Sequence, residues 1–343
     1  WWSESAQAGA IPQEWTPSAT NDAGDTILGD SPGAIVDGWT LRDQLMIYKN
    51  NSTYTMQYVA GQYIFAFRKL FPTIGAQSLN CACELDAVQY VFTGEDVVRH
   101  DGQNVQSMID RKVIKDFIAS VDGARLPLCC IVARAIERQI WVCIPVVGQP
   151  YLSQALIINT DDGYVGRATL PNVAAVIRGT INPAGAIAQE TWAEDPYPWS
   201  TDTTIWTQST FSPTNDSLMM TQTAANLLQA VGIGSSADGA PIATSLERLS
   251  MKAGEGLHHG VITQIVPLIQ GLTGDILQVR VGQQNFFNES IRWNPYRNFV
   301  IGESRSISEI IDGRYISLQF NISTVNEWTM QGYYLKTKQS GEY

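Results

Sequence analysis

Short apolar runs, each closed by a turn rich in Asn, Asp or Gly, recur in the first half of the chain at a spacing of roughly 45 residues. The runs cover residues 45–48, 88–92 and 140–144. Each is followed by a turn and a second strand-like segment, which is typical of antiparallel hairpins. A hairpin cannot bury both faces alone, but sheets stacked radially cover one another. The pattern therefore predicts an all-β chain folded as a β-propeller.

The same pattern suggests about five or more blades, joined by long inter-strand loops. Three complete blades are predicted at residues 35–71, 76–118 and 126–177. Further strands are expected in the less regular stretch that follows and in two later pairs, at residues 217–221 and 226–231, at 261–268 with 276–281, and at 314–320 with 328–335.

One segment, residues 105–118, has a different periodicity. Val105, Met108, Ile109 and Val113 recur at helical spacing, and Asn104 is placed to cap a helix start. A short helix is therefore expected here. The alternative is a fourth, edge strand of the second blade with a bent start.

The composition along the chain suggests a simple domain division. Residues 1–33 are rich in Ser, Thr, Asn, Asp, Gly and Pro and are predicted to form a loop-rich segment. Since the chain opens on Trp1 without an initiator Met, we expect an upstream part to be missing. Residues 34–343 are assigned to the propeller, in which 183–249 form an irregular blade or a projecting insertion.

The net charge of −11 argues against sequence-independent binding of nucleic acid, which requires Lys and Arg to neutralise phosphates. An acidic wall would instead repel DNA and let it slide past. The five cysteines, at 81, 83, 129, 130 and 143, lie in apolar strand-like runs, so we expect buried free thiols and assembly in a reducing cytoplasm.

The residues that usually carry chemistry do not form a recognisable site. His258 and His259 are not expected to bind one metal ion together, since neighbours on a strand point to opposite faces. These two residues and His100 are interpreted as surface histidines. No nucleophile elbow, phosphate-binding loop or calcium loop occurs, so no catalytic, cofactor-binding or metal-binding residues are assigned, and the chain is not expected to be an enzyme. No run approaches 18 apolar residues, so stable membrane insertion is not expected.

Aromatic residues gather in one loop-like stretch. Trp192, Trp199 and Trp206 are expected to pack on a neighbouring blade or subunit. The neighbouring Glu194 and Asp195 raise an alternative, because glycosidases place two carboxylates beside a sugar-stacking aromatic surface. One functional hypothesis is therefore a carbohydrate-binding or glycoside-hydrolysing propeller that recognises a receptor. A second is an interaction propeller that serves as a cellular scaffold.

Several short sequence segments together resemble those of one known family. They are the strands and turns of the third blade and two later segments, at residues 139–145, 154–159, 162–164, 169–171, 312–317 and 328–333. Residues 101–107 and 246–248 fit the same resemblance. These phrases resemble the β-propeller nozzle or tail-hub proteins of short-tailed bacteriophages, over most of residues 35–338.

This resemblance implies a structural role in the virion. Proteins of that family form a homo-oligomeric, hexameric ring at the end of the tail, below an adaptor ring, and tail fibres or spikes attach around it. On this resemblance, Trp192, Trp199 and Trp206 are candidates for a subunit or fibre contact. The ring forms and gates the conduit for DNA ejection, so genomic DNA is a passing, non-specific cargo. The expected location is the virion tail, after assembly in the host cytoplasm, with no cofactor.

Overall fold

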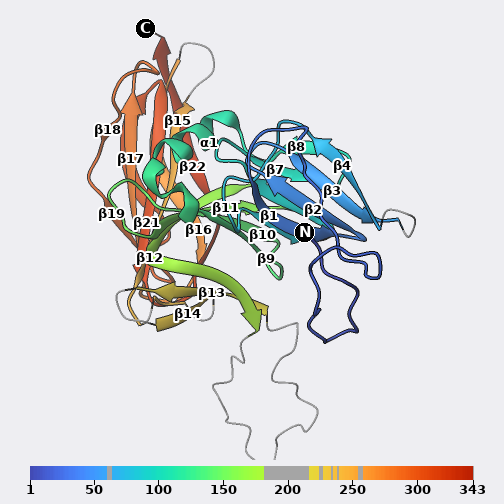
Figure 1. Cartoon of the computed structure of the whole chain (residues 1–343). Coiled ribbons are helices and arrows are strands. Elements are labelled where there is room, and N and C mark those ends of the chain that lie inside the picture. Colours follow the sequence, from blue (N-terminus) through green and yellow to red (C-terminus); the bar gives the residue numbers. More distant parts are fainter. Residues whose placement is uncertain are drawn as a thin grey trace, which may run out of the picture. The chain divides into compact units, whose positions relative to one another are not determined.

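The computed structural model describes residues 1–59, 64–180, 216–223, 227–232, 235–237, 239–253 and 258–342. The chain divides into two compact units, Trp1–Val231 and Gly232–Tyr343. The regular secondary structure of both is almost entirely antiparallel strand, which confirms the predicted all-β class (Figure 1). None of the helices in the described ranges is long and apolar enough to cross a membrane.

The first two sheets of the first unit are four-stranded meanders, in which every strand pairs with the next along the chain. The first sheet contains β1 (Ile35–Leu41), β2 (Gln44–Lys49), β3 (Thr53–Tyr58) and β4 (Phe65–Phe71). The second contains β5 (Ala82–Leu85), β6 (Val88–Phe92), β7 (Val97–His100) and β8 (Val105–Ser107). The predicted segments 35–71 and 76–118 thus each contain one complete sheet.

The third sheet of this unit is a longer meander of six strands. Its members are β9 (Cys130–Arg134), β10 (Gln139–Ile144), β11 (Leu152–Asn159), β12 (Val165–Thr180), β13 (Asp216–Gln222) and β14 (Leu227–Val231). Bulges interrupt the pairing of β12 on both sides, and such bulges bend a strand. The sheet curls into a half-barrel, so that β12 returns to β9. The strands predicted at 217–221 and 226–231 continue this sheet.

The curled sheet separates two apolar clusters. Alternate residues of β9 and β10, such as Ile131 and Ile140, join the main core together with the second sheet. The residues between them, such as Val132 and Trp141, fill the inside of the half-barrel. Full burial of an Ile such as Ile140 stabilises the fold by about 2 kcal/mol.

Residues 105–118, for which a short helix or an edge strand was predicted, contain both. Residues 105–107 form the edge strand β8, and the helix α1 follows at Arg111–Ala119. The prediction that Asn104 caps a helix is wrong, because α1 begins only at Arg111. Asn104 lies in the turn before β8, where its backbone N–H donates to Asp101 Oδ1, 2.7 Å away. Gly102 in that turn has φ +90°, which favours glycine. A short 3₁₀ segment, Gly123–Leu128, leads on to β9.

The N-terminal residues 1–33 are attached to the first sheet without forming a strand of it. Trp2 forms an isolated bridge with Gly24, and its ring packs on Phe65 and Phe67 of β4. The ammonium group of Lys49, which is buried, donates to the carbonyl oxygens of Leu28 and Ser31. These contacts give the loop-rich segment a fixed course over the sheet.

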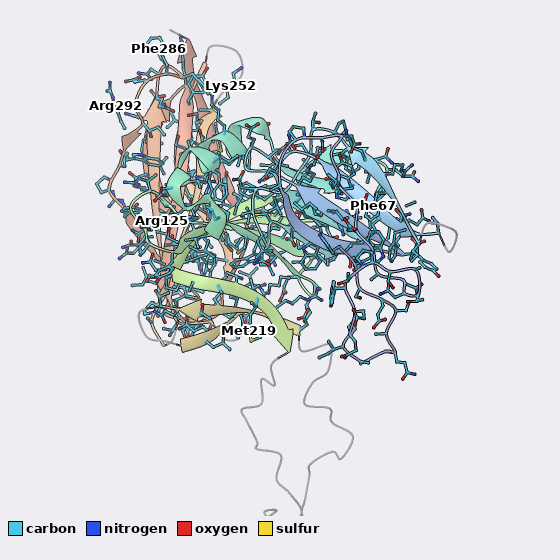
Figure 2. All side chains as sticks on the ribbon, viewed as in Figure 1. Phe67, Arg125, Met219, Lys252, Phe286 and Arg292 are labelled. Carbon is cyan, nitrogen blue, oxygen red and sulfur yellow. The ribbon has the colours of Figure 1, made fainter. Side chains whose placement is uncertain are left out.

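The second unit has two sheets that share one core. The larger contains β15 (Ile242–Lys252), β17 (Ile276–Gln284), β18 (Arg292–Trp293), β19 (Arg297–Val300) and β21 (Tyr315–Thr324). The smaller contains β16 (His258–Gln270), β20 (Ile307–Gly313) and β22 (Thr329–Glu342). Leu318 from the larger sheet and Ile265 from the smaller belong to the same buried cluster. Figure 2 shows Phe286 and Arg292 on the outside of this unit.

The predicted pairing of strands in the second unit is wrong, although the strands themselves are present. Residues 261–268 and 276–281 were expected to pair, but β16 pairs with β20 and β22, whereas β17 pairs with β18, β19 and β21. Likewise β21 and β22 lie in different sheets. Each of these connections crosses from one sheet to the other, because both sheets must cover a single core.

Of the fold prediction, the all-β class is therefore confirmed and the propeller architecture is not. The fold is nearly all β, with several antiparallel sheets. Three of these sheets are sequential meanders, and the two sheets of the second unit are not. A propeller of five or more blades is not shown.

Candidate functional site

The aromatic contact predicted from the sequence cannot be placed. Trp192, Trp199 and Trp206, together with Glu194 and Asp195, lie outside the described residues. Their roles as a subunit or fibre contact, or as a sugar site, stay predictions. The described residues instead present a groove in the first unit, a buried polar network between its first two sheets, and a polar hollow in the second unit.

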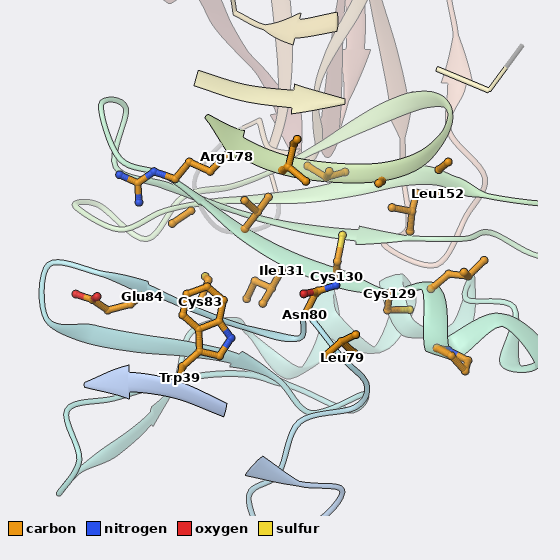
Figure 3. A pocket seen from close by; sticks show the side chains of 18 residues that line it. Trp39, Leu79, Asn80, Cys83, Glu84, Cys129, Cys130, Ile131, Leu152 and Arg178 are labelled. Atoms are coloured by element: carbon orange, nitrogen blue, oxygen red, sulfur yellow. The ribbon is translucent and has the colours of Figure 1, made fainter. Parts of the chain in front are cut away.

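The groove of the first unit has a volume of about 510 Å³ and lies between β5, β9 and β12. Figure 3 shows Trp39 and Glu84 on one side and Arg178 on the other. Its walls are mostly apolar, with Ile131 in the middle. Arg178 forms an ion pair with Asp216 of the adjoining strand β13. The guanidinium group is therefore held by the protein itself.

All five cysteines are buried and free, as predicted. Cys129 packs in the main core and Cys130 inside the half-barrel, which confirms that these neighbours point to opposite faces. Burial raises the pKa of Cys81 to about 11 and that of Cys129 to about 12. The contact with Cys143, directly opposite on β10, and burial raise the pKa of Cys130. Since nucleophilic attack requires the thiolate, the raised pKa values of Cys81, Cys129 and Cys130 disfavour it at neutral pH.

The prediction that His100 lies on the surface is wrong, because only 1% of it is exposed. Its Nε2 lies 2.6 Å from the hydroxyl of Tyr48 on β2. That hydroxyl donates to Gln89 Oε1 on β6, and Gln89 Nε2 donates to the carbonyl oxygen of Thr40, 3.0 Å away. The network therefore links the first sheet to the second through side chains. His258 and His259 begin β16, and their side chains lie outside the described part.

The network determines the state of the His100 ring. Because the Tyr48 hydroxyl hydrogen points to Gln89, Nε2–H of His100 must donate to the Tyr48 oxygen. Nδ1 then keeps its lone pair and has no partner in the described structure. Burial lowers the pKa of His100 to about 4, despite the opposing influence of Asp101. The ring is therefore neutral at pH 7 and joins the sheets without charge.

The hollow of the second unit has a volume of about 600 Å³ and lies on the outer face of the larger sheet. Strand alternation explains its polarity: Leu318, Phe320 and Ile322 of β21 face the core, and the residues between them face outward. The polar lining comes from four strands and consists of Thr244, Ser245, Gln278, Asn298, Gln319, Asn321 and Ser323.

The floor of this hollow is held by Gln319, which is 7% exposed. Its Oε1 accepts from Arg280 Nε and from the Tyr296 hydroxyl, the latter at 2.8 Å. Its Nε2 donates to Ser245 Oγ at 3.2 Å and to a carboxylate oxygen of Glu247. Both ends of the amide are thus satisfied, which fixes its orientation.

Aromatic rings hold the Arg280 guanidinium on this face. Its Cζ lies 4.5 Å from the ring centre of Trp293 and 4.6 Å from that of Tyr296. The Trp293 ring reaches this place because β17 has Gly282 opposite it. A Cβ on Gly282 would come within 2.9 Å of that ring. The Tyr296 hydroxyl also accepts from Asn321 Nδ2 at 2.8 Å, so aromatic, cationic and amide groups form one rigid network.

No group of three or more His, Cys, Asp or Glu that could hold a metal ion occurs among the described residues. Comparison with protein-family models and with curated proteins finds no match for this chain.

Sequence reasoning missed both polar networks. Apolar and polar residues alternate along 315–324, and a polar outer face could have been predicted from this pattern. The partners of β21, however, come from residues about 35 and 70 positions earlier in the chain, and no local pattern pairs strands over such distances. The same holds for His100, whose partner Tyr48 is 52 positions away.

Proposed function

We propose that this chain is a structural component of a phage tail, a nozzle or hub whose homo-oligomeric, hexameric ring forms and gates the DNA ejection conduit. The proposal rests mainly on one observation. The three repeated apolar runs at 45–48, 88–92 and 140–144 each lie in the second strand of a meander sheet. Successive meanders of this kind are the units from which propellers are built.

On this proposal the three meanders are blades of a β-propeller with five or more blades. The second unit does not have the strand order of a blade. The remaining blades would therefore be formed by residues that belong neither to the three meanders nor to the second unit. The two extra strands β13 and β14, which lengthen the third sheet, follow residues 181–215, to which we assign the contact made by Trp192, Trp199 and Trp206. An adaptor ring and tail fibres or spikes would be the partners at such surfaces.

The distribution of charge supports a conduit formed by the first unit. That unit contains 13 Lys and Arg against 23 Asp and Glu, whereas the second contains 9 against 10. A channel wall with an excess of carboxylates would let DNA pass without binding it. The role is mechanical: the ring holds the channel closed and opens on contact with the host, without catalysis.

The test is the native mass of the purified full chain, measured by light scattering over a range of concentrations. The proposal predicts growth toward a closed species of six chains, each of 37.7 kDa. Duplex DNA should not bind to the protein at physiological salt. A monomer at every concentration that also retains duplex DNA would contradict the proposal.

A further inference from the structure

We propose that the hollow on the outer face of the larger sheet of the second unit is a binding site for a neutral carbohydrate. This site is distinct from the aromatic stretch around Trp192, and the inference does not depend on ring formation or on the proposed tail function. Four features of the hollow support it: its row of amides, its rigid floor, its balanced charge and a buried acceptor.

The amide side chains lie in one row across the sheet. In the strand register Ser245 is opposite Asn321, Asn321 is opposite Gln278, and Gln278 is opposite Asn298. Neighbouring strands are about 4.8 Å apart, so the row presents a polar group at each step. Amides and hydroxyls both donate and accept hydrogen bonds, as do the hydroxyl groups of a sugar. The row therefore matches a ligand with hydroxyls spread along its length.

The floor under this row is preorganised. Gln319 is nearly buried and has partners at both ends of its amide. Gln278 and Asn298, by contrast, are exposed above it and face each other across β17 and β19. A fixed floor lowers the ordering cost of binding, because only the exposed amides need to adjust to a ligand.

The charged groups at the hollow do not favour an ionic ligand. Arg280 and Glu247 both bond to Gln319, from opposite ends of its amide. The guanidinium group is further covered by the rings of Trp293 and Tyr296. Since one cation and one anion are both engaged by the protein, the hollow offers no unbalanced charge to a phosphate, a sulfate or a basic peptide.

One polar atom in the hollow needs a donor. Asn321 Oδ1 is buried and has no hydrogen-bond partner among the described residues, although Asn321 Nδ2 is bonded to Tyr296. A buried acceptor without a partner costs free energy, and a ligand hydroxyl would satisfy it once a rotation of the Asn321 side chain opens this oxygen to the hollow. The half-exposed side chain of Ile276 adds an apolar surface beside it, which suits the C–H face of a sugar ring.

The experiment uses the full chain on a glycan array that carries neutral, sialylated and sulfated oligosaccharides, together with an unstructured peptide as a further probe. We expect binding to neutral glycans, which is then quantified by calorimetry and by the fluorescence of the tryptophans with the best neutral hit. The test variant is Gln278→Ala combined with Asn298→Ala, since both side chains are exposed and the fold should tolerate their loss. It should weaken binding by about tenfold or more.

The matched control is Gln331→Ala, which removes an exposed amide from β22 of the smaller sheet and should leave the affinity unchanged. Circular dichroism verifies that all variants are folded. Absence of binding to every neutral glycan would overturn the proposal, as would preference for the charged glycans or the peptide. Equal affinity of the double variant and the wild type would also overturn it, because the sugar would then bind elsewhere.

Discussion

The two units of this protein are both antiparallel β-structures, but they differ in how far apart in the chain their paired strands lie. In the first unit every strand pairs with its neighbour in sequence, through three successive meanders. In the second, most pairs join strands separated by other strands, such as β15 with β21 and β16 with β22. The first unit is also strongly acidic, whereas the second is nearly neutral.

This difference shows what a repeated local pattern can encode. A hairpin closes a short loop, so the strands and turns that form it are adjacent in the sequence. A sheet assembled by long crossings depends on the shared core, which no single segment contains. The buried clusters of the two units have no residue in common, so we expect two separable unfolding steps.

The largest expected effect is on thiol reactivity. All five cysteines belong to the first unit, where they are buried with raised pKa values for Cys81 and Cys129. Reaction with a thiol reagent at pH 8 should be at least about a thousandfold slower in the native protein than in the unfolded chain. The rate, followed by absorbance across a denaturant series, should report only the unfolding of the first unit. Fast native labelling would contradict the burial of these thiols.

Core truncations should separate the two units. Leu318→Ala in the second unit and Ile140→Ala in the first each remove a fully buried side chain and should cost about 3 kcal/mol. Scanning calorimetry should show Leu318→Ala lowering one transition and Ile140→Ala the other. If either variant shifted a single transition of the whole chain, the two units would form one cooperative block.

Acid should destabilise the first unit through His100. Its pKa of about 4 in the folded state lies below the ordinary 6.5, so the unfolded state binds more protons between these values. Stability from this group is therefore full above pH 6.5 and decreases as the pH falls toward 4, by at most about 3 kcal/mol. His100→Gln keeps a donor for Tyr48 and should flatten this dependence in chemical denaturation. An unchanged pH profile would assign the acid sensitivity to other groups.

The polar link between the first two sheets should have a smaller effect. Tyr48→Phe removes the hydroxyl that lies between Gln89 and His100 and leaves both without this partner. The expected loss is about 2 kcal/mol, because buried polar groups lose their hydrogen bonds. Thr55→Val, which removes the hydroxyl bonded to Gln44 within the first sheet, serves as a comparison at a nearby site. If Tyr48→Phe lost no more free energy of unfolding than Thr55→Val, the link between the sheets would contribute no more than a hydrogen bond within one sheet.

The smallest effect is expected for a surface ion pair. Arg138 contacts Asp86 at 3.0 Å and Asp161 at 2.6 Å, and these three side chains are all about half exposed. Arg138→Gln should cost less than about 1 kcal/mol and should lose that effect in high salt. A larger, salt-independent loss in urea denaturation would mean that packing rather than charge holds this side chain.

The sequence predicted most of the first unit because its signals are local. The apolar runs at 45–48, 88–92 and 140–144 correctly placed one strand in each of the three sheets. In the second unit the strands were predicted, but the partner of β17 was wrong, since β16 and β17 are consecutive in the sequence and belong to different sheets. The polar hollow depends on that pairing, so it could not be predicted.

The proposed function is tested most directly by electron microscopy of the assembled full chain at high concentration. The account predicts rings with six-fold symmetry and an open or plugged central channel, whose wall is formed by the acidic first unit. Particles without a channel, or rings whose channel is lined by the second unit, would contradict it.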